Sequence, residues 1–144
     1  MAEKLCSLKK IGGGGGSLTE TVLWTNASPT SAFAAQVVTL SDDMNNYTYL
    51  KFEYRHSTTN SNLYEIIVPV DLYKTSLTPD SGNTTHYIPS MSVMNGGQYA
   101  FANIYARVIP YKTDTSIEIS SARSLSGATL ALTNVIPTRI IGMK

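Results

Sequence analysis

Residues 47–56, which read YTYLKFEYRH, carry the clearest structural signal in this chain of 144 residues. Apolar and charged side chains alternate along the segment, one set on each side: Leu50, Phe52 and Tyr54 on one, Lys51, Glu53 and Arg55 on the other. Successive side chains of a strand point to opposite faces, so a period of two indicates a half-buried antiparallel strand. The segment therefore predicts a β-strand with one face in a core.

Similar runs lie along the chain from Leu18 onward, and turn-forming residues separate them. They are residues 33–40, 64–70, 87–94, 99–109, 115–121, 129–136 and 138–142. No stretch after Gly16 shows a sustained helical period. Roughly eight short strands with regularly placed turns predict an all-β fold, an antiparallel β-sandwich or jelly roll.

Three of these runs carry more specific predictions. Residues 64–70 are almost continuously apolar, so both faces of that strand should be covered, with Pro69 at a sheet edge or a bulge. In the runs 115–121 and 129–136, the branched apolar residues should point into the core: Ile117, Ile119, Leu130 and Leu132.

The five glycines at 12–16 indicate a flexible break, because glycine is costly to hold in one conformation. They divide the chain into an N-terminal anchoring segment with a glycine hinge, residues 1–17, and a β-sandwich head domain, residues 18–144. The single cysteine, Cys6, excludes an intramolecular disulfide, so packing alone should hold the fold.

Charged residues make up only 15% of the chain and the formal net charge is +1, so no basic field exists to attract nucleic acid. No apolar run is long enough to predict a membrane span. The charged residues 1–10 are followed by glycines rather than by an apolar core, so no signal peptide is predicted. The protein is therefore expected to be made in a cytoplasm.

Catalytic and metal-binding constellations are not evident in the sequence. The two histidines, His56 and His86, are interpreted as surface residues. Asp42, Asp43 and Asp80 lie in expected loops, where capping of turns explains them better than calcium binding. No Gly-x-Ser-x-Gly elbow occurs.

Three glutamates, Glu53, Glu65 and Glu118, are the candidates for a carboxylate pair of the glycosidase type. Glu53 lies between Lys51 and Arg55, however, so cross-strand ion pairing is the preferred interpretation. We predict no catalytic, cofactor-binding or metal-binding residues, no cofactor, and no enzyme activity.

Residues 99–109 are unusual because both faces of the expected strand are apolar or aromatic. A lone sandwich leaves one face of a strand in water, so a second copy of the chain would explain the second covered face. Tyr99, Phe101 and Tyr105 are therefore the candidate oligomer interface. A loop over an interior strand is the alternative. Trp24 is expected in the core or in an interface.

Two segments resemble known proteins. Residues 23–36, LWTNASPTSAFAAQ, are similar to the "LWTNxSPTxxFxxQ" opening of small structural proteins encoded in phages and prophages of Gram-positive gut bacteria. Residues 135–144, VIPTRIIGMK, are similar to the "xxxPxxIxGIK" terminus of the same group. The resemblance implies a virion accessory protein of the tail tip, tail fibre or head decoration. It also implies a trimeric β-structure, and it carries no catalytic residues over.

The sequence is thus interpreted as a phage virion structural protein with an oligomeric β head, expected to be a homotrimer. Residues 1–17 would attach it to other virion proteins, and its place would be the virion. Contact with a host cell-surface glycan stays open. The alternative is a carbohydrate-binding module whose platform is drawn from the nine tyrosines. A glycosidase fragment is a third and weaker interpretation.

Overall fold

The computed structural model describes residues 17–75, 89–95, 103–124 and 130–144. Within these ranges the chain forms ten β-strands in three antiparallel sheets. The helical elements described are a 3-10 turn, η1 (Met44–Asn46), and one short helix, α1 (Val70–Thr75). The predicted all-β class is confirmed.

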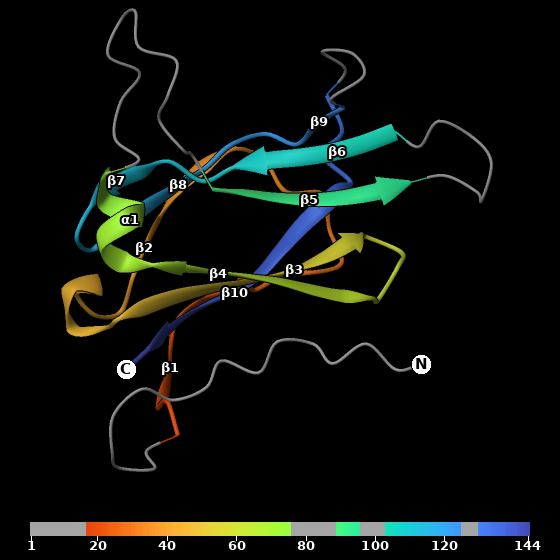
Figure 1. Ribbon diagram of the computed structural model, residues 1–144. Helices are drawn as coiled ribbons and strands as arrows, with labels where there is room; N and C mark the ends of the chain where they lie inside the picture. The colour runs from red at the N-terminus through yellow and green to blue at the C-terminus, as the bar shows by residue number, and fades with distance from the viewer. Residues whose placement is uncertain (1–16, 76–88, 96–102, 125–129) are drawn as a thin grey trace, which may run out of the picture.

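Four strands form the first sheet: β1 (Glu20–Thr25), β3 (Tyr49–Ser57), β4 (Leu63–Pro69) and β10 (Asn134–Met143). Their order is β1-β10-β3-β4, so β10 lies between β1 and β3 and pairs with both (Figure 1). The two ends of the head domain therefore lie side by side in one sheet.

The other two sheets contain three strands each. One has the order β2 (Gln36–Thr39), β8 (Ser116–Ile119), β7 (Tyr111–Thr113), and the other has the order β5 (Ser90–Asn95), β6 (Asn103–Val108), β9 (Arg123–Ser124).

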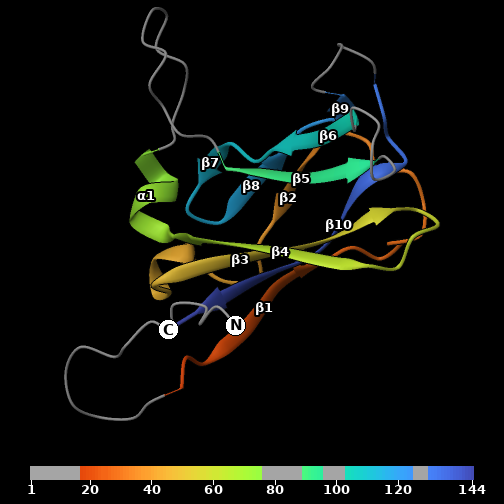
Figure 2. The same ribbon diagram turned by 45° about the vertical axis from the view of Figure 1, so that its right-hand side comes forward.

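Backbone hydrogen bonds join these two sheets where the end of β8 meets the end of β6. Ser120 N–H donates to the Val108 carbonyl and Glu118 N–H to the Pro110 carbonyl, both at 3.1 Å. The result is one second layer that lies over the first sheet, as a β-sandwich requires (Figure 2). The jelly-roll topology is not confirmed.

Alternation along β3 and β8 is as the sequence predicts. Leu50, Phe52 and Tyr54 are buried, and Ile117 and Ile119 are buried completely. These residues face one another across the two layers, together with residues from β5, β6 and β10. The polar side of β3 faces outward.

The prediction for residues 64–70 is wrong. In β4 the side chains of Leu63 and Ile67 are 65% and 49% exposed, and Val68 is buried on the other face. β4 is an edge strand of the first sheet, and the face that carries Leu63 and Ile67 points away from the core. Pro69 does lie on this edge strand, as predicted, and α1 begins directly after it.

Residues 129–136 and 138–142 do not form two strands. β10 runs through Pro137, and its register against β3 shifts between Pro137 and Arg139. Such a bulge tolerates a proline, which has no N–H to donate to the ladder. Leu130 precedes this strand and is 52% exposed, so its predicted inward position is wrong, and Leu132 is only partly buried.

The strand expected at 99–109 is described from Asn103 as β6. Its inward side consists of Tyr105, which packs against the core, and the fully buried Arg107, followed by Ile109 just past the end of the strand. Its outward side includes Val108, which is 40% exposed. Tyr99 and Phe101 lie outside the described residues.

Arg107 is a charged side chain in the middle of the core. Its Nε donates to the Val135 carbonyl, and its Nη1 donates to the Ser120 carbonyl at 2.8 Å. Its Nη2 donates to three further carbonyls, those of Phe33, Leu132 and Asn134. Burial lowers the pKa of Arg107 to about 10, which leaves it protonated at neutral pH.

The same interaction holds an unfavourable backbone conformation. Val135 has a φ of 53°, in the left-handed region that β-branched residues rarely adopt. Val135 is fully buried at the start of β10, and its carbonyl accepts the Nε–H of Arg107. The strain, of order 1–3 kcal/mol at such positions, is therefore held by the surrounding contacts.

We predict that Arg107→Met lowers the free energy of unfolding by more than about 2 kcal/mol, because it leaves several buried carbonyls without a donor. Urea unfolding followed by circular dichroism measures this. Arg55→Met is the matched control. It removes a surface arginine and should change the free energy by no more than about 0.5 kcal/mol. Equal unfolding midpoints for the two variants would contradict the structural role of Arg107.

Candidate functional site

Residues 23–36 and residues 135–144 are joined to each other in the structure. Asn26 directly follows β1 and bonds to β10 twice: its Nδ2 donates to the Pro137 carbonyl at 2.8 Å, and its N–H donates to the Thr138 carbonyl at 2.9 Å. Its Oδ1 accepts the Ser28 N–H, an Asx turn that directs the chain into the next loop. Asn26 thus fixes the loop after β1 to β10.

Trp24 and Phe33 extend this arrangement into the core. Their rings meet edge to face with centroids 6.2 Å apart, and the Arg107 guanidinium carbon lies 5.2 Å from the centroid of the Phe33 ring. Trp24 is partly buried against the core, in agreement with its expected position. These two aromatic residues of the first segment therefore support the core.

Gly142, in the second segment, leaves room for Tyr47. A Cβ built on Gly142 would lie 2.5 Å from Cγ of the Tyr47 ring. The ring is buried, and its hydroxyl donates to Asp42 Oδ2 at 2.8 Å, while Lys144 Nζ lies 5.2 Å from the ring centroid. A side chain at position 142 would therefore clash with a ring that Asp42 holds at its hydroxyl and Lys144 contacts on its face.

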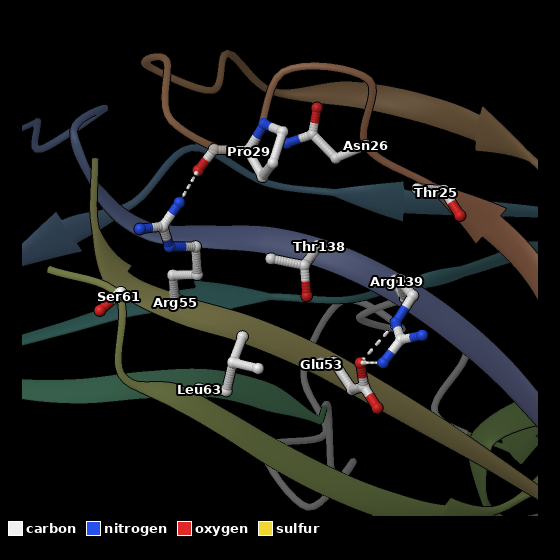
Figure 3. Close-up of a pocket in the computed structure, with 9 residues that line it drawn as sticks. All are labelled: Thr25, Asn26, Pro29, Glu53, Arg55, Ser61, Leu63, Thr138 and Arg139. Carbon is white, nitrogen blue, oxygen red and sulfur yellow. Dashed lines mark hydrogen bonds and ion pairs between the residues drawn. The ribbon is translucent and has the colours of Figure 1, made fainter. Parts of the chain in front are cut away.

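A hollow of about 510 Å³ lies on the outer face of the first sheet, between the loop after β1 and the β3–β4 hairpin (Figure 3). We call it the outer hollow. Its lining residues are Thr25, Asn26, Pro29, Glu53, Arg55, Ser61, Leu63, Thr138 and Arg139. They come from β1, β3, β4, β10 and two loops, so the hollow exists only in the folded sheet.

Register shifts shape the outer hollow. β10 shifts against β3 between Pro137 and Arg139, and β1 shifts against β10 between Val22 and Trp24. Bulges re-aim side chains and occur often beside functional sites. Thr138 is the extra residue of β10, and Figure 3 shows it between the two arginines. Its Oγ1 is buried and has no hydrogen-bond partner in the described structure.

Glu53 is neutralised from two sides. Its Oε2 accepts Nε and Nη2 of Arg139, both at 2.7 Å, and its Oε1 lies 3.5 Å from Lys51 Nζ. Lys51 also bonds to Glu20 at 2.7 Å, and that hydrogen bond raises the pKa of Lys51. The predicted cross-strand ion pairing of Glu53 is confirmed.

Arg55 differs from these neighbours. Its Nη1 donates to the Pro29 carbonyl at 3.3 Å, and no carboxylate of the described residues pairs with it. Figure 3 shows its side chain reaching across the hollow toward the loop that carries Pro29. The hollow therefore contains one paired guanidinium, that of Arg139, and one held by a single carbonyl.

The three candidate glutamates do not meet in one pocket. Glu65 is the Cα partner of Glu53 across β3 and β4 but does not line the outer hollow. Glu118 lies in the second layer and pairs with Lys112 at 2.6 Å. The hollow is consequently lined by one carboxylate, which already binds Arg139.

The remaining candidates have structural contacts or lie outside the described residues. Asp43 caps η1 by accepting the Asn45 N–H, which confirms the capping prediction there, and Asp42 accepts the Asp43 N–H. His56 Nε2 lies 3.1 Å from the Met94 carbonyl. The structure does not describe His86, Asp80, Tyr99, Phe101 or the anchoring segment up to residue 16.

The described ranges contain neither a metal-binding cluster nor a membrane-spanning helix. No group of three histidine, cysteine, aspartate or glutamate residues is placed to hold a metal ion there. In the same residues no helix combines the length and apolarity that crossing a membrane takes. The surface features described above are the outer hollow and the outer faces of the two layers.

We predict that Gly142→Ala destabilises the fold by about 1–3 kcal/mol, because the added methyl overpacks against the Tyr47 ring. Chemical unfolding of the variant measures the loss. The control is the same substitution in a Tyr47→Ala background, where the ring is absent and Gly142→Ala should cost much less. An equal cost in both backgrounds would show that the ring is not what requires glycine.

Comparison with known proteins assigns the chain to no family. No protein-family model matches the chain, and no curated protein matches it.

Proposed function

We propose that this chain is a structural protein of a phage virion whose β-sandwich is an oligomeric head domain. The resemblance of residues 23–36 and 135–144 supports the class of protein. The single structural observation that supports assembly is an apolar outer face on the second layer. We call it the β5–β6 face: Met94, Ile104, Ala106 and Val108.

The β5–β6 face is a strip of neighbouring side chains. Met94 and Ile104 are Cα partners across β5 and β6, and Met94 is 67% exposed. Beside Ala106 and Val108 lies a second hollow, of about 390 Å³, which extends to Ala35 and Glu118. Ser92 and Ser90, the Cα partners of Ala106 and Val108, lie on the same side of the sheet, so the strip combines apolar and small polar side chains. Exposed apolar surface rimmed by polar residues is a feature of interaction sites.

A second copy of the chain is the partner that this face fits best. The second hollow carries charges of both signs, Glu118 and Arg123, so the surface is not selective for a strongly charged partner. Homo-oligomers are also the commonest assemblies of soluble proteins. The face differs from the predicted interface at Tyr99, Phe101 and Tyr105, because the side chain of Tyr105 packs inward.

The number of copies and the place of the protein follow from the resemblance alone. It supports a homotrimer in the virion, joined to other virion proteins through residues 1–17. A head that assembles and makes contact needs no catalytic group, so this proposal includes no enzyme activity.

We predict that the purified chain is a trimer by light scattering at micromolar concentration, and that Met94→Glu combined with Val108→Glu makes it a monomer. Buried like charges at an interface are strongly destabilising, which is the physical reason. Leu72→Glu on α1 is the matched control, since Leu72 is an exposed apolar residue on another element. It should leave the trimer intact.

A monomeric wild-type chain would overturn the oligomer. A trimer that survives the double substitution would show that the β5–β6 face is not its interface.

A carbohydrate-binding module is the second candidate, and the outer hollow is the observation that favours it. Hydroxyl and amide groups surround this hollow: Thr25, Asn26, Ser61 and Thr138. No tyrosine lines it, so the expected tyrosine platform is not what this site offers. A glycan array tests this candidate. Glycan binding by a chain that stays monomeric would favour it over the virion head.

A further inference from the structure

The outer hollow contains a guanidinium, that of Arg55, that forms no ion pair with a carboxylate of the described residues. On this face of the sheet Lys51 pairs with Glu20 and Glu53, and Arg139 pairs with Glu53. Arg55 has one long hydrogen bond, to the Pro29 carbonyl. An arginine side chain presents five N–H donors, so most of the donors of Arg55 are available to a ligand.

Glu53 does not cancel that charge. Arg139 and Lys51 hold both of its carboxylate oxygens, so an anion entering beside Arg55 meets a carboxylate that is already neutralised. Guanidinium groups bind carboxylate and phosphate oxygens with two parallel hydrogen bonds. Arg55 is therefore a suitable partner for a ligand that carries one such group.

The rest of the hollow fits a polyhydroxylated body attached to that anion. Thr25 and Ser61 supply hydroxyl groups, and Asn26 and Thr138 lie beside them. Thr138 Oγ1 itself is buried beneath this lining and has no hydrogen-bond partner among the described residues.

Leu63 adds apolar surface, with 65% of its side chain exposed beside these polar groups. A sugar ring has hydroxyl groups at its edges and an apolar face, so it matches both the polar lining groups and Leu63. The volume of about 510 Å³ lies within the range of small-molecule sites, roughly 300–1,000 Å³.

We infer that the outer hollow binds a saccharide that carries an acidic group, with the carboxylate or phosphate on Arg55. The hydroxyls bond to the side chains of Thr25 and Ser61, and the apolar ring face packs on Leu63. The inference deepens the glycan contact considered above and rests on that contact, but it does not depend on the oligomeric state.

The test is isothermal titration calorimetry of the full chain with three probes. Trigalacturonate carries carboxylates, a short poly(glycerol phosphate) carries phosphates, and maltotriose is a neutral saccharide of similar size. We expect at least one acidic probe to bind about tenfold or more tightly than maltotriose, and its affinity to fall as salt rises. The two acidic arms identify which anion the site takes.

Arg55→Met should reduce the affinity for the acidic probe about tenfold or more and leave that for maltotriose unchanged. Arg55→Lys should recover only part of it, because lysine cannot make the bidentate contact. Arg123→Met, which removes an exposed arginine of the second layer, is the matched control and should bind as the wild type does. Urea unfolding of each variant shows that the fold is kept.

Three results would overturn the inference: no binding of either acidic probe at millimolar concentration, equal affinity for acidic and neutral probes, or unchanged binding by Arg55→Met. The virion head has a separate readout, which is light scattering. A trimer that binds no acidic saccharide contradicts only this inference. A monomer that binds one through Arg55 supports this inference and contradicts the oligomeric virion head.

Discussion

The guanidinium of Arg107 is the contact on which both layers depend. It projects inward from β6 and donates to carbonyls at the start of β10, in the loop before β2 and beside β8. A charge in this position is stable only while its donors are bonded, because an unpaired buried charge costs several kcal/mol. Carbonyl groups take the place of a carboxylate here. The core is thus specified by geometry as well as by apolar area, and it fixes Val135 in its left-handed conformation.

This interior arrangement involves residues of both segments 23–36 and 135–144. Phe33 supplies both a carbonyl and a ring to Arg107, Asn26 bonds to β10, and Gly142 makes room for Tyr47. Residues 23–36 and 135–144 thus have structural contacts, and they also supply five of the nine residues that line the outer hollow: Thr25, Asn26, Pro29, Thr138 and Arg139. The β5–β6 face lies on the opposite layer.

The sequence predicts the class of fold well, because burial on one face of a strand imposes a period of two, as in β3 and β8. The sequence does not predict that Arg107 is buried, since an arginine in an alternating strand usually lies on the solvent side. The sequence pattern wrongly places Leu130 in the core and wrongly divides β10 at Pro137. The bulge at Pro137 lets the strand continue past a residue that has no N–H to donate. The outer hollow joins Asn26, Arg55 and Thr138, which are far apart in the chain, so only their meeting in the folded sheet reveals it.

The side-chain protons of Arg107 offer the most direct test of this account. In protein labelled with ¹⁵N and ¹³C at neutral pH, NMR should show Nε–H and Nη–H resonances of Arg107 that exchange slowly with water. Hydrogen-bond scalar coupling should connect Nε to the Val135 carbonyl. Arg55 should show fast exchange in the same sample. Rapid exchange at Arg107, equal to that at Arg55, would contradict a guanidinium sealed between the layers and bonded to backbone carbonyls.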